Sequence, residues 1–189
     1  MITFNYGTMN SAKSVNLICK AYELKQKNLK YICLYPKLDT RTDNGFITSR
    51  AGLKVLAIPI INKDNLRDIL EKFYLLDFSY VLIDEIQFLT KEEIDILLEA
   101  SINDNMNILC YGLLTDFKTE MFEASKRLVE VADELHHIKS YCNCGNIASV
   151  NARIDKKGNI VNEGSKILIG AEDKYITLCK KCYYKKLNN

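Results

Sequence analysis

The opening stretch Met1-Ile2-Thr3-Phe4-Asn5-Tyr6-Gly7-Thr8-Met9-Asn10-Ser11-Ala12-Lys13-Ser14 decides the fold class of this chain. An apolar, strand-like run leads into a loop that ends in Lys-Ser, and a segment with helical spacing follows. A phosphate-binding loop requires this context, because its backbone N–H groups wrap phosphates at a helix N-terminus while the lysine reaches the outer phosphates. We therefore expect the phosphates of a nucleoside triphosphate to contact Gly7, Thr8, Met9, Asn10, Ser11, Ala12, Lys13 and Ser14.

One position departs from the usual phosphate-loop pattern. Ala12 stands where glycine normally precedes the lysine, and its methyl group occupies space where the backbone approaches the ligand. An ordinary turn with a solvated lysine is the alternative interpretation of such a degenerate match. The remainder of the chain has to decide between the two.

Length, charge and cysteine content restrict the class of protein. A chain of 189 residues is long enough for one domain with a small appendage. The formal charge of +2 gives no electrostatic footprint for duplex nucleic acid or an anionic membrane. No apolar stretch approaches the ~20 residues that cross a bilayer, and a secretory leader pattern is absent. We expect a cytoplasmic protein.

Strand-like and helix-like periodicities alternate through the first part of the chain. Residues 37–52 are polar and predict a long loop. Strands separated by helices imply right-handed crossovers, so the pattern predicts an α/β fold of the P-loop NTPase type, with a mainly parallel sheet and helices on both faces. The expected strands are 1–6, 31–35, 54–60, 80–83 and 107–111. The expected helices cover 15–28, the segment from Leu66 to Phe73, a segment that begins at a capping box of Thr90 and Glu93, and 121–132.

The pattern changes after about residue 135. One more strand is expected at 136–141, and a glycine-containing, loop-rich stretch follows at 150–178. We expect a nucleotide-binding domain over residues 1–135 and a small appended domain over residues 136–189.

A second motif follows the apolar strand at 80–83. A strand that ends in Asp84 and Glu85, in a chain that opens with a phosphate loop, fits a Walker B element. Asp84 and Ser14 would then support Mg²⁺, and Glu85 would act as the general base beside the acceptor hydroxyl. The alternative is that the two acids simply terminate a strand.

Four of the seven cysteines cluster near the C-terminus as Cys142-Asn143-Cys144 and Cys179-Lys180-Lys181-Cys182. Tetrahedral Zn²⁺ takes four soft ligands from two short turns, and a full set of thiolates predicts a structural zinc rather than a catalytic one. Free thiols are the alternative, and ligation by His136 or His137 is a weaker one.

These pieces together resemble the zinc-containing thymidine kinases over nearly the whole chain, from Met1 to Tyr184. The Cys-x-Cys-Gly form of the first cysteine pair is similar to the bacterial branch of that family. The resemblance rests on the phosphate loop, the cysteines and the motifs Asp39-Thr40-Arg41, Thr48-Ser49-Arg50-Ala51-Gly52-Leu53, Asp84-Glu85-Ile86-Gln87-Phe88, Tyr111-Gly112-Leu113-Leu114-Thr115-Asp116-Phe117 and Ile169-Gly170-Ala171-Glu172-Asp173-Lys174-Tyr175.

The resemblance implies a kinase domain that binds ATP with Mg²⁺ and a zinc-binding lasso domain that covers the nucleoside. It implies that Glu85 accepts the 5′-hydroxyl proton of thymidine, and that Asp39 and Arg41 lie near the transferring phosphate. The ATP-binding set then includes Asp84, Glu85, Ile86 and Gln87. The implied thymidine-binding set is Met9, Leu113, Phe117, Phe122, Leu168, Ile169, Gly170, Ala171 and Tyr175.

The family resemblance also implies a homotetramer and feedback inhibition by the end product dTTP. Two other classes of function stay open at this point. A nucleotide-binding regulatory protein without transferase activity would be consistent with Ala12, and a zinc-stabilised nucleic-acid-binding module would be consistent with the cysteine knuckle and the lysine-rich tail. The near-neutral charge argues against the second alternative.

Overall fold

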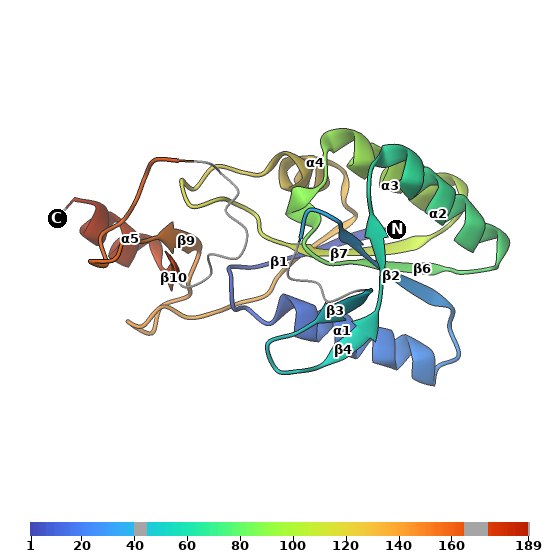
Figure 1. Ribbon diagram of the computed structural model, residues 1–189, viewed down its shortest axis with the longest axis horizontal. Coiled ribbons are helices and arrows are strands. Elements are labelled where there is room, and N and C mark those ends of the chain that lie inside the picture. Colours follow the sequence, from blue (N-terminus) through green and yellow to red (C-terminus); the bar gives the residue numbers. More distant parts are fainter. Residues whose placement is uncertain (40–44, 165–173, 189) are drawn as a thin grey trace.

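The computed structural model describes residues 1–39, 45–164 and 174–188. A six-stranded sheet forms its centre, with strand order β5-β2-β6-β7-β1-β8, and every neighbouring pair in this sheet is parallel (Figure 1). The predicted mainly parallel sheet is confirmed. Its strands are β1 (Ile2–Tyr6), β2 (Tyr31–Pro36), β5 (Ile58–Ile60), β6 (Tyr80–Ile83), β7 (Asn107–Gly112) and β8 (Glu134–His137).

Helices cover both faces of this sheet, as predicted. Successive side chains of a strand point to opposite faces, so Ile32 and Leu34 of β2 pack among the helices of one face, while Cys33 and Tyr35 pack against α1 on the other. The first face carries α2 (Lys63–Leu75), α3 (Lys91–Asn103) and α4 (Glu123–Val131). The second face carries α1 (Lys13–Gln26). A short 3₁₀ helix, η1 (Ile86–Phe88), follows β6.

The path of the chain marks the carboxyl ends of the strands as the expected ligand-binding edge of the sheet. The chain leaves β1 for α1 on one face, whereas it leaves the neighbouring strand β7 for α4 on the other face. In open α/β sheets, ligands bind where neighbouring connections diverge in this way. The loops after β1, β6 and β7 are therefore where a bound substrate is expected.

The expected single strand at 54–60 is wrong, because the segment forms two strands. The first, β4 (Lys54–Leu56), pairs antiparallel with β3 (Phe46–Thr48), which lies inside the region expected to be a loop. The second, β5, joins the edge of the main sheet. Ala57 separates them, since its N–H donates to the Gly45 carbonyl at 2.8 Å and its side chain is buried against α1.

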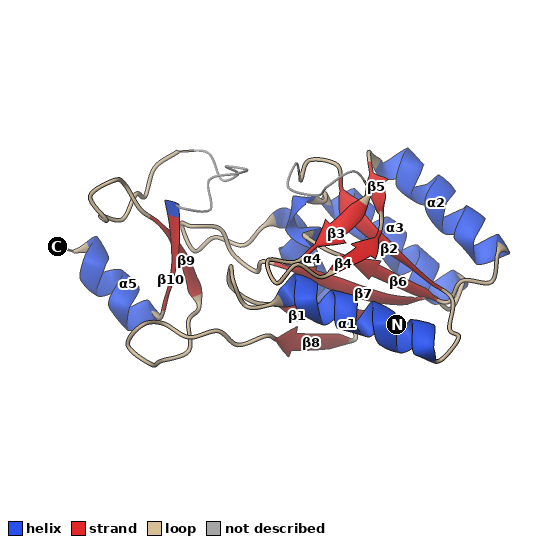
Figure 2. Cartoon of the chain, turned by 60° about the horizontal axis from the view of Figure 1, so that its bottom comes forward, coloured by secondary structure: helices blue, strands red, loops and turns tan. Residues whose placement is uncertain are grey.

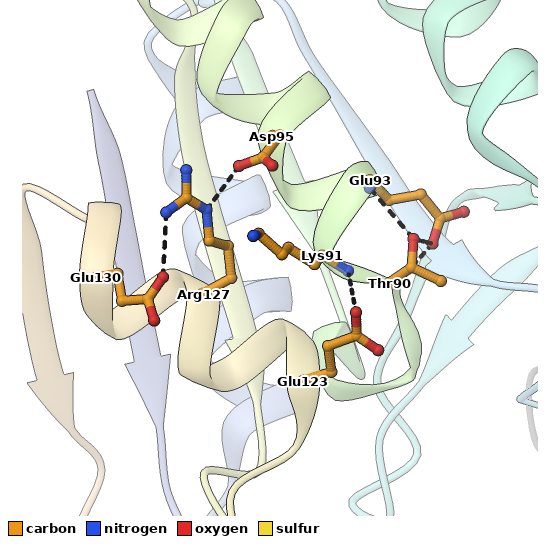
Figure 3. A network of polar contacts seen from close by, with 7 residues as sticks. All are labelled: Thr90, Lys91, Glu93, Asp95, Glu123, Arg127 and Glu130. Atoms are coloured by element: carbon orange, nitrogen blue, oxygen red, sulfur yellow. Dashed lines mark hydrogen bonds and ion pairs between the residues drawn. The ribbon is translucent and has the colours of Figure 1, made fainter.

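Helix α3 begins at the predicted capping box (Figure 3). The Thr90 hydroxyl accepts from the Glu93 N–H at 3.2 Å, and the Glu93 carboxylate accepts from the Thr90 N–H at 2.8 Å. Arg127 of α4 donates to Asp95 of α3 at 2.6 Å and to Glu130 at 3.1 Å, so it ties the two helices together. None of the described helices is long and apolar enough to span a membrane.

The last part of the chain forms a second, smaller unit. The strand expected at 136–141 is displaced: β8 covers Glu134–His137 and pairs with β1, so the expected domain boundary at residue 135 falls inside this strand. Beyond it, β9 (Val150–Arg153) and β10 (Tyr175–Leu178) form an antiparallel pair, and α5 (Lys180–Leu187) packs on them. Figure 2 shows these three elements grouped at one end of the molecule.

Candidate functional site

The loop between β1 and α1 has the close packing that a phosphate-binding loop needs. The Gly7 N–H donates to the Gly112 carbonyl at 3.2 Å, and a Cβ added at Gly7 would lie 2.6 Å from the Ile138 carbonyl oxygen. Only glycine fits at this position. The buried Lys13 folds across the loop and donates from Nζ to the Thr8 carbonyl at 2.7 Å. The loop thus surrounds its own lysine, whose ammonium group is the positive charge that an outer phosphate would meet.

Ala12 adopts the backbone conformation that glycine favours. Its φ is 63° and its ψ is 28°, in the left-handed region, at the residue that caps the N-terminus of α1. The Cβ of an L-residue in this region costs about 1–2 kcal/mol. The conformation explains why phosphate loops usually carry glycine here, and it shows that the alanine is accommodated at the expense of backbone strain. The neighbouring Ser11 is buried, and its Oγ makes no hydrogen bond to any described residue.

The phosphate loop and the end of β6 meet through a hydroxyl and a carboxylate. Ser14 Oγ donates to Asp84 Oδ2 at 2.6 Å, although the two residues are 70 positions apart. Burial, with a smaller contribution from the negative charge of Glu85, raises the pKa of Asp84 to about 7, while Ser14 and Lys13 act in the opposite direction. Mg²⁺ prefers oxygen ligands of this kind, and a bound cation would stabilise the buried carboxylate in its ionised form. The donor set therefore fits a magnesium ion.

Glu85 is held by a neighbouring amide. Gln87 Nε2 donates to Glu85 Oε2 at 2.5 Å, and Gln87 Oε1 accepts from the Leu113 N–H at 2.9 Å. A Cβ added at Gly112 would lie 2.5 Å from Gln87 Oε1 and 2.6 Å from Ile86 Cγ2, so the glycine leaves the space that the amide occupies. Glu85 itself has a φ of 50°, a conformation that only a small fraction of non-glycine residues adopt. Such strained positions occur often at functional sites.

Two of the expected nucleoside contacts come together around an arginine. The guanidinium carbon of Arg153 lies 3.7 Å from the centre of the Phe117 ring, and Arg153 donates to Tyr175 Oη from Nη2 at 2.6 Å and from Nε at 3.0 Å. Leu113 and Phe122 lie in the β7–α4 connection, where the Leu113 carbonyl accepts from Ser125 Oγ at 2.6 Å.

Two other expected site residues lie in the loops after β1 and β2, and five are not described. Met9 faces the second unit, since its N–H donates to Asn151 Oδ1 at 2.7 Å. Asp39 is buried just after β2, and its N–H donates a hydrogen bond to the Pro36 carbonyl at 2.9 Å. Five predicted residues lie outside the described part of the chain: Arg41, Leu168, Ile169, Gly170 and Ala171.

The four C-terminal cysteines form one cluster. Their Sγ atoms all lie within 4.8 Å of one another, and Cys144 Sγ and Cys179 Sγ are 3.6 Å apart. A tetrahedral zinc with Zn–S bonds of ~2.3 Å separates its sulfurs by roughly 3.8 Å, whereas a disulfide bond measures ~2.05 Å. All seven cysteines are free of disulfides. The geometry therefore suits a tetrahedral metal ion with four thiolate ligands.

Local hydrogen bonding favours thiolates in half of this cluster. Contacts from the backbone and side chain of Asn146 lower the pKa of Cys144 to about 6, and the backbone N–H groups of Cys144 and Cys179 lower the pKa of Cys142. The neighbouring thiols raise the pKa of Cys182 to about 12. Four adjacent sulfurs cannot all ionise without a positive charge among them, and a divalent metal supplies that charge.

Strand β9 carries contacts that the sequence analysis did not single out. Asn151 meets the phosphate loop at Met9, and Arg153 meets Phe117. In the connection between β8 and β9, Ser140 Oγ lies 2.5 Å from Thr8 Oγ1. No short motif contains these residues. The one available signal is that a polar and a charged side chain alternate along an otherwise apolar strand, and polar groups are buried when they have partners.

Comparison with known proteins gives a consistent result. A family profile described as thymidine kinase matches residues 1–183. A thymidine kinase of Zymomonas mobilis subsp. mobilis is 37% identical over 98% of this chain and 97% of that protein. A thymidine kinase of Legionella pneumophila strain Paris is 40% identical over 95% of this chain and 87% of that protein, and one of Mannheimia succiniciproducens is 35% identical over 94% of this chain and 91% of that protein.

The match extends from the phosphate loop to the last cysteine pair, so it includes both the parallel-sheet unit and the cysteine cluster described above. The relatives align over most of their own length as well as most of this chain. The chain belongs to the thymidine kinase family.

Proposed function

We propose that this protein is a thymidine kinase that transfers the γ-phosphate of ATP to the 5′-hydroxyl of thymidine or deoxyuridine, giving dTMP or dUMP and ADP in pyrimidine salvage. The observation that carries the proposal is the 2.6 Å contact between Ser14 Oγ and Asp84 Oδ2, with Glu85 next in the chain. This contact brings together the phosphate loop and the acidic strand end that phosphoryl transfer requires.

In this proposal the loop from Gly7 to Ser14 binds the ATP phosphates, with Lys13 turned from the Thr8 carbonyl toward the outer phosphates. Ser14 and Asp84 hold Mg²⁺, which would neutralise charge on the phosphate oxygens. Residues 84–87 border the phosphates. Asp39 and Arg41 are proposed to lie near the transferring group, where the arginine would offset its negative charge.

Glu85 is the proposed general base. Its carboxylate takes the proton of the 5′-hydroxyl while that oxygen forms a bond to the γ-phosphorus, and the bond from this phosphorus to the β-phosphate bridging oxygen breaks, so ADP leaves. The amide of Gln87 keeps the carboxylate in one orientation through the 2.5 Å hydrogen bond.

The proposed nucleoside pocket is formed by the β7–α4 connection and the C-terminal unit. Its walls are Met9, Leu113, Phe117, Phe122 and Tyr175, and the backbone of residues 168–171 is proposed to bind the base. Apolar walls with a few fixed polar groups are typical of nucleobase sites. Zn²⁺ bound by Cys142, Cys144, Cys179 and Cys182 would fasten both ends of the intervening loop and reduce the entropy lost when that loop orders.

Three further points are also proposals. We propose a homotetramer and inhibition by dTTP, which the family resemblance implies, and a cytoplasmic location, which the sequence pattern predicts. Each has a direct measurement: mass from light scattering, localisation of the tagged protein, and initial rates with added dTTP.

A thymidine-dependent assay of ADP release tests the function, with mass spectrometry of the nucleoside product. The expected result is dTMP formation that requires ATP and Mg²⁺ and that collapses in Glu85→Gln. ATP binding without transfer would favour the regulatory alternative instead. Retention on DNA that weakens with added salt would favour the nucleic-acid-binding alternative.

A further inference from the structure

We propose that Arg153 is a positioning residue of the nucleoside pocket, which fixes the Phe117 ring and the Tyr175 hydroxyl in the arrangement that accepts the base. This inference rests on the proposed function, because it concerns how the same pocket recognises its pyrimidine nucleoside.

The side chain of Arg153 joins two walls that come from distant parts of the chain. Phe117 follows β7 in the first unit, and Tyr175 begins β10 in the second. The guanidinium carbon lies 3.7 Å from the Phe117 ring centre and 5.3 Å from the Tyr175 ring centre. Two guanidinium N–H groups converge on one acceptor, Tyr175 Oη, at 2.6 and 3.0 Å.

The backbone around Arg153 makes this arrangement rigid. Arg153 stands opposite Tyr175 in the antiparallel pair β9–β10, so the contact between their side chains is set by the strand register. Arg153 is only 7% exposed and Phe117 only 1%. Gly164 also lies near the guanidinium. A Cβ added at Gly164 would lie 3.2 Å from Arg153 Nη1, so the glycine leaves room for the arginine side chain.

The chemistry of the contact needs arginine in particular. A planar guanidinium can stack on an aromatic face while its N–H groups, in a fixed fork, donate in the same plane. The ammonium group of lysine is a point charge and cannot stack in this way. Since Tyr175 Oη accepts from the guanidinium, its own proton points away from Arg153, and within the described part of the chain no residue accepts it. Arg153 thus fixes both the position of the Phe117 ring in the pocket wall and the direction in which the Tyr175 hydroxyl donates.

Phe117 also contacts the second unit through its backbone. Its carbonyl accepts from Tyr183 Oη at 3.5 Å, and Tyr183 follows Cys182 of the cysteine cluster. Phe117 is therefore held by the second unit at its ring and at its carbonyl. A change of the Arg153 side chain removes the contact with the Phe117 ring and leaves the contact of Tyr183 with the Phe117 carbonyl in place, so the two contacts of Phe117 can be tested separately.

The test compares Arg153→Lys with the matched control Arg67→Lys, whose side chain is exposed and pairs only with the exposed Glu99 among the described residues. We expect the KM for thymidine of Arg153→Lys to rise about tenfold, with the KM for ATP and kcat within about twofold, because each lost contact of this kind is worth about one power of ten in affinity. A role in folding alone would instead change both KM values, the zinc content and the Tm together. That result would overturn the inference.

A second variant, Tyr175→Phe, removes the acceptor and keeps the ring. If Arg153 acts through Tyr175, this change also raises the KM for thymidine, and the double variant shows less than the product of the two single effects. Strictly multiplicative effects would refute the positioning role. An unchanged KM for thymidine in Tyr175→Phe would refute it even if Arg153→Lys fails to fold.

Wild-type turnover separates this inference from the function on which it rests. No thymidine phosphorylation by the wild-type protein would remove the proposed function and the inference with it. Normal wild-type turnover with an unchanged KM for thymidine in Arg153→Lys would remove the inference alone.

Discussion

Replacement of Ala12 by glycine is the perturbation for which the structure gives the clearest expectation. Ala12 has a φ of 63° at the start of α1, where a Cβ costs about 1–2 kcal/mol. Glycine removes this strain but gives the unfolded chain more freedom, which offsets about 0.4–1 kcal/mol of the gain. We therefore expect Ala12→Gly to increase the free energy of unfolding by about 0.5–1 kcal/mol.

The expected thermal shift is small but measurable. For a chain of this size, 1 kcal/mol corresponds to about 2–4 °C in Tm, so Ala12→Gly should raise the Tm of the ligand-free protein by about 1–4 °C. Differential scanning calorimetry measures this shift, and titration with ATP measures the affinity. Because glycine also lets the backbone approach the phosphates, ATP affinity should be unchanged or higher.

Ala21→Gly is the matched control, because Ala21 lies within the same helix at an ordinary helical position and is 1% exposed. There the same substitution should lower stability by at least about 0.5–1 kcal/mol. A lower Tm for Ala12→Gly, or a large fall in its ATP affinity, would show that the left-handed conformation is not the reason for the unusual residue.

The remaining predictions concern the acids and the metal cluster. Glu85→Gln should reduce kcat by about 10²–10⁴ while isothermal titration still detects ATP and thymidine, and near-normal turnover would exclude Glu85 as the base. The pKa of Asp84 is raised from 3.8 to about 7, so the stability that its protonated form contributes is lost as the pH rises through that range. Asp84→Asn should therefore raise the Tm of the magnesium-free protein at pH 8 more than at pH 5, and an equal shift at both would contradict the assigned cause. Cys182→Ser should abolish stoichiometric zinc binding and raise the KM for thymidine more than that for ATP, whereas full zinc content by atomic absorption would remove this cysteine from the ligand set.

Local sequence signals predicted most of the fold correctly. The apolar run before Gly7, the helical spacing after it and the Thr90–Glu93 capping box depend on interactions between residues close in sequence, so they can be read without the tertiary structure. The prediction of one strand at 54–60 was wrong because the division of this segment depends on residues outside it. Its apolar residues are consistent with one strand, and only pairing with residues 46–48 divides it at Ala57.

The features of the candidate site also fall into those that local sequence predicts and those that only the tertiary structure decides. The sequence by itself determined the phosphate loop, the acidic pair after β6 and the four cysteines, because their chemistry demands fixed residue types at short spacings. Only the tertiary structure decided that Ser14 meets Asp84, that Ala12 is left-handed, and that Arg153 lies between Phe117 and Tyr175. These contacts join residues between 22 and 70 positions apart or depend on a single backbone angle, and no local pattern specifies which distant strands and loops will meet.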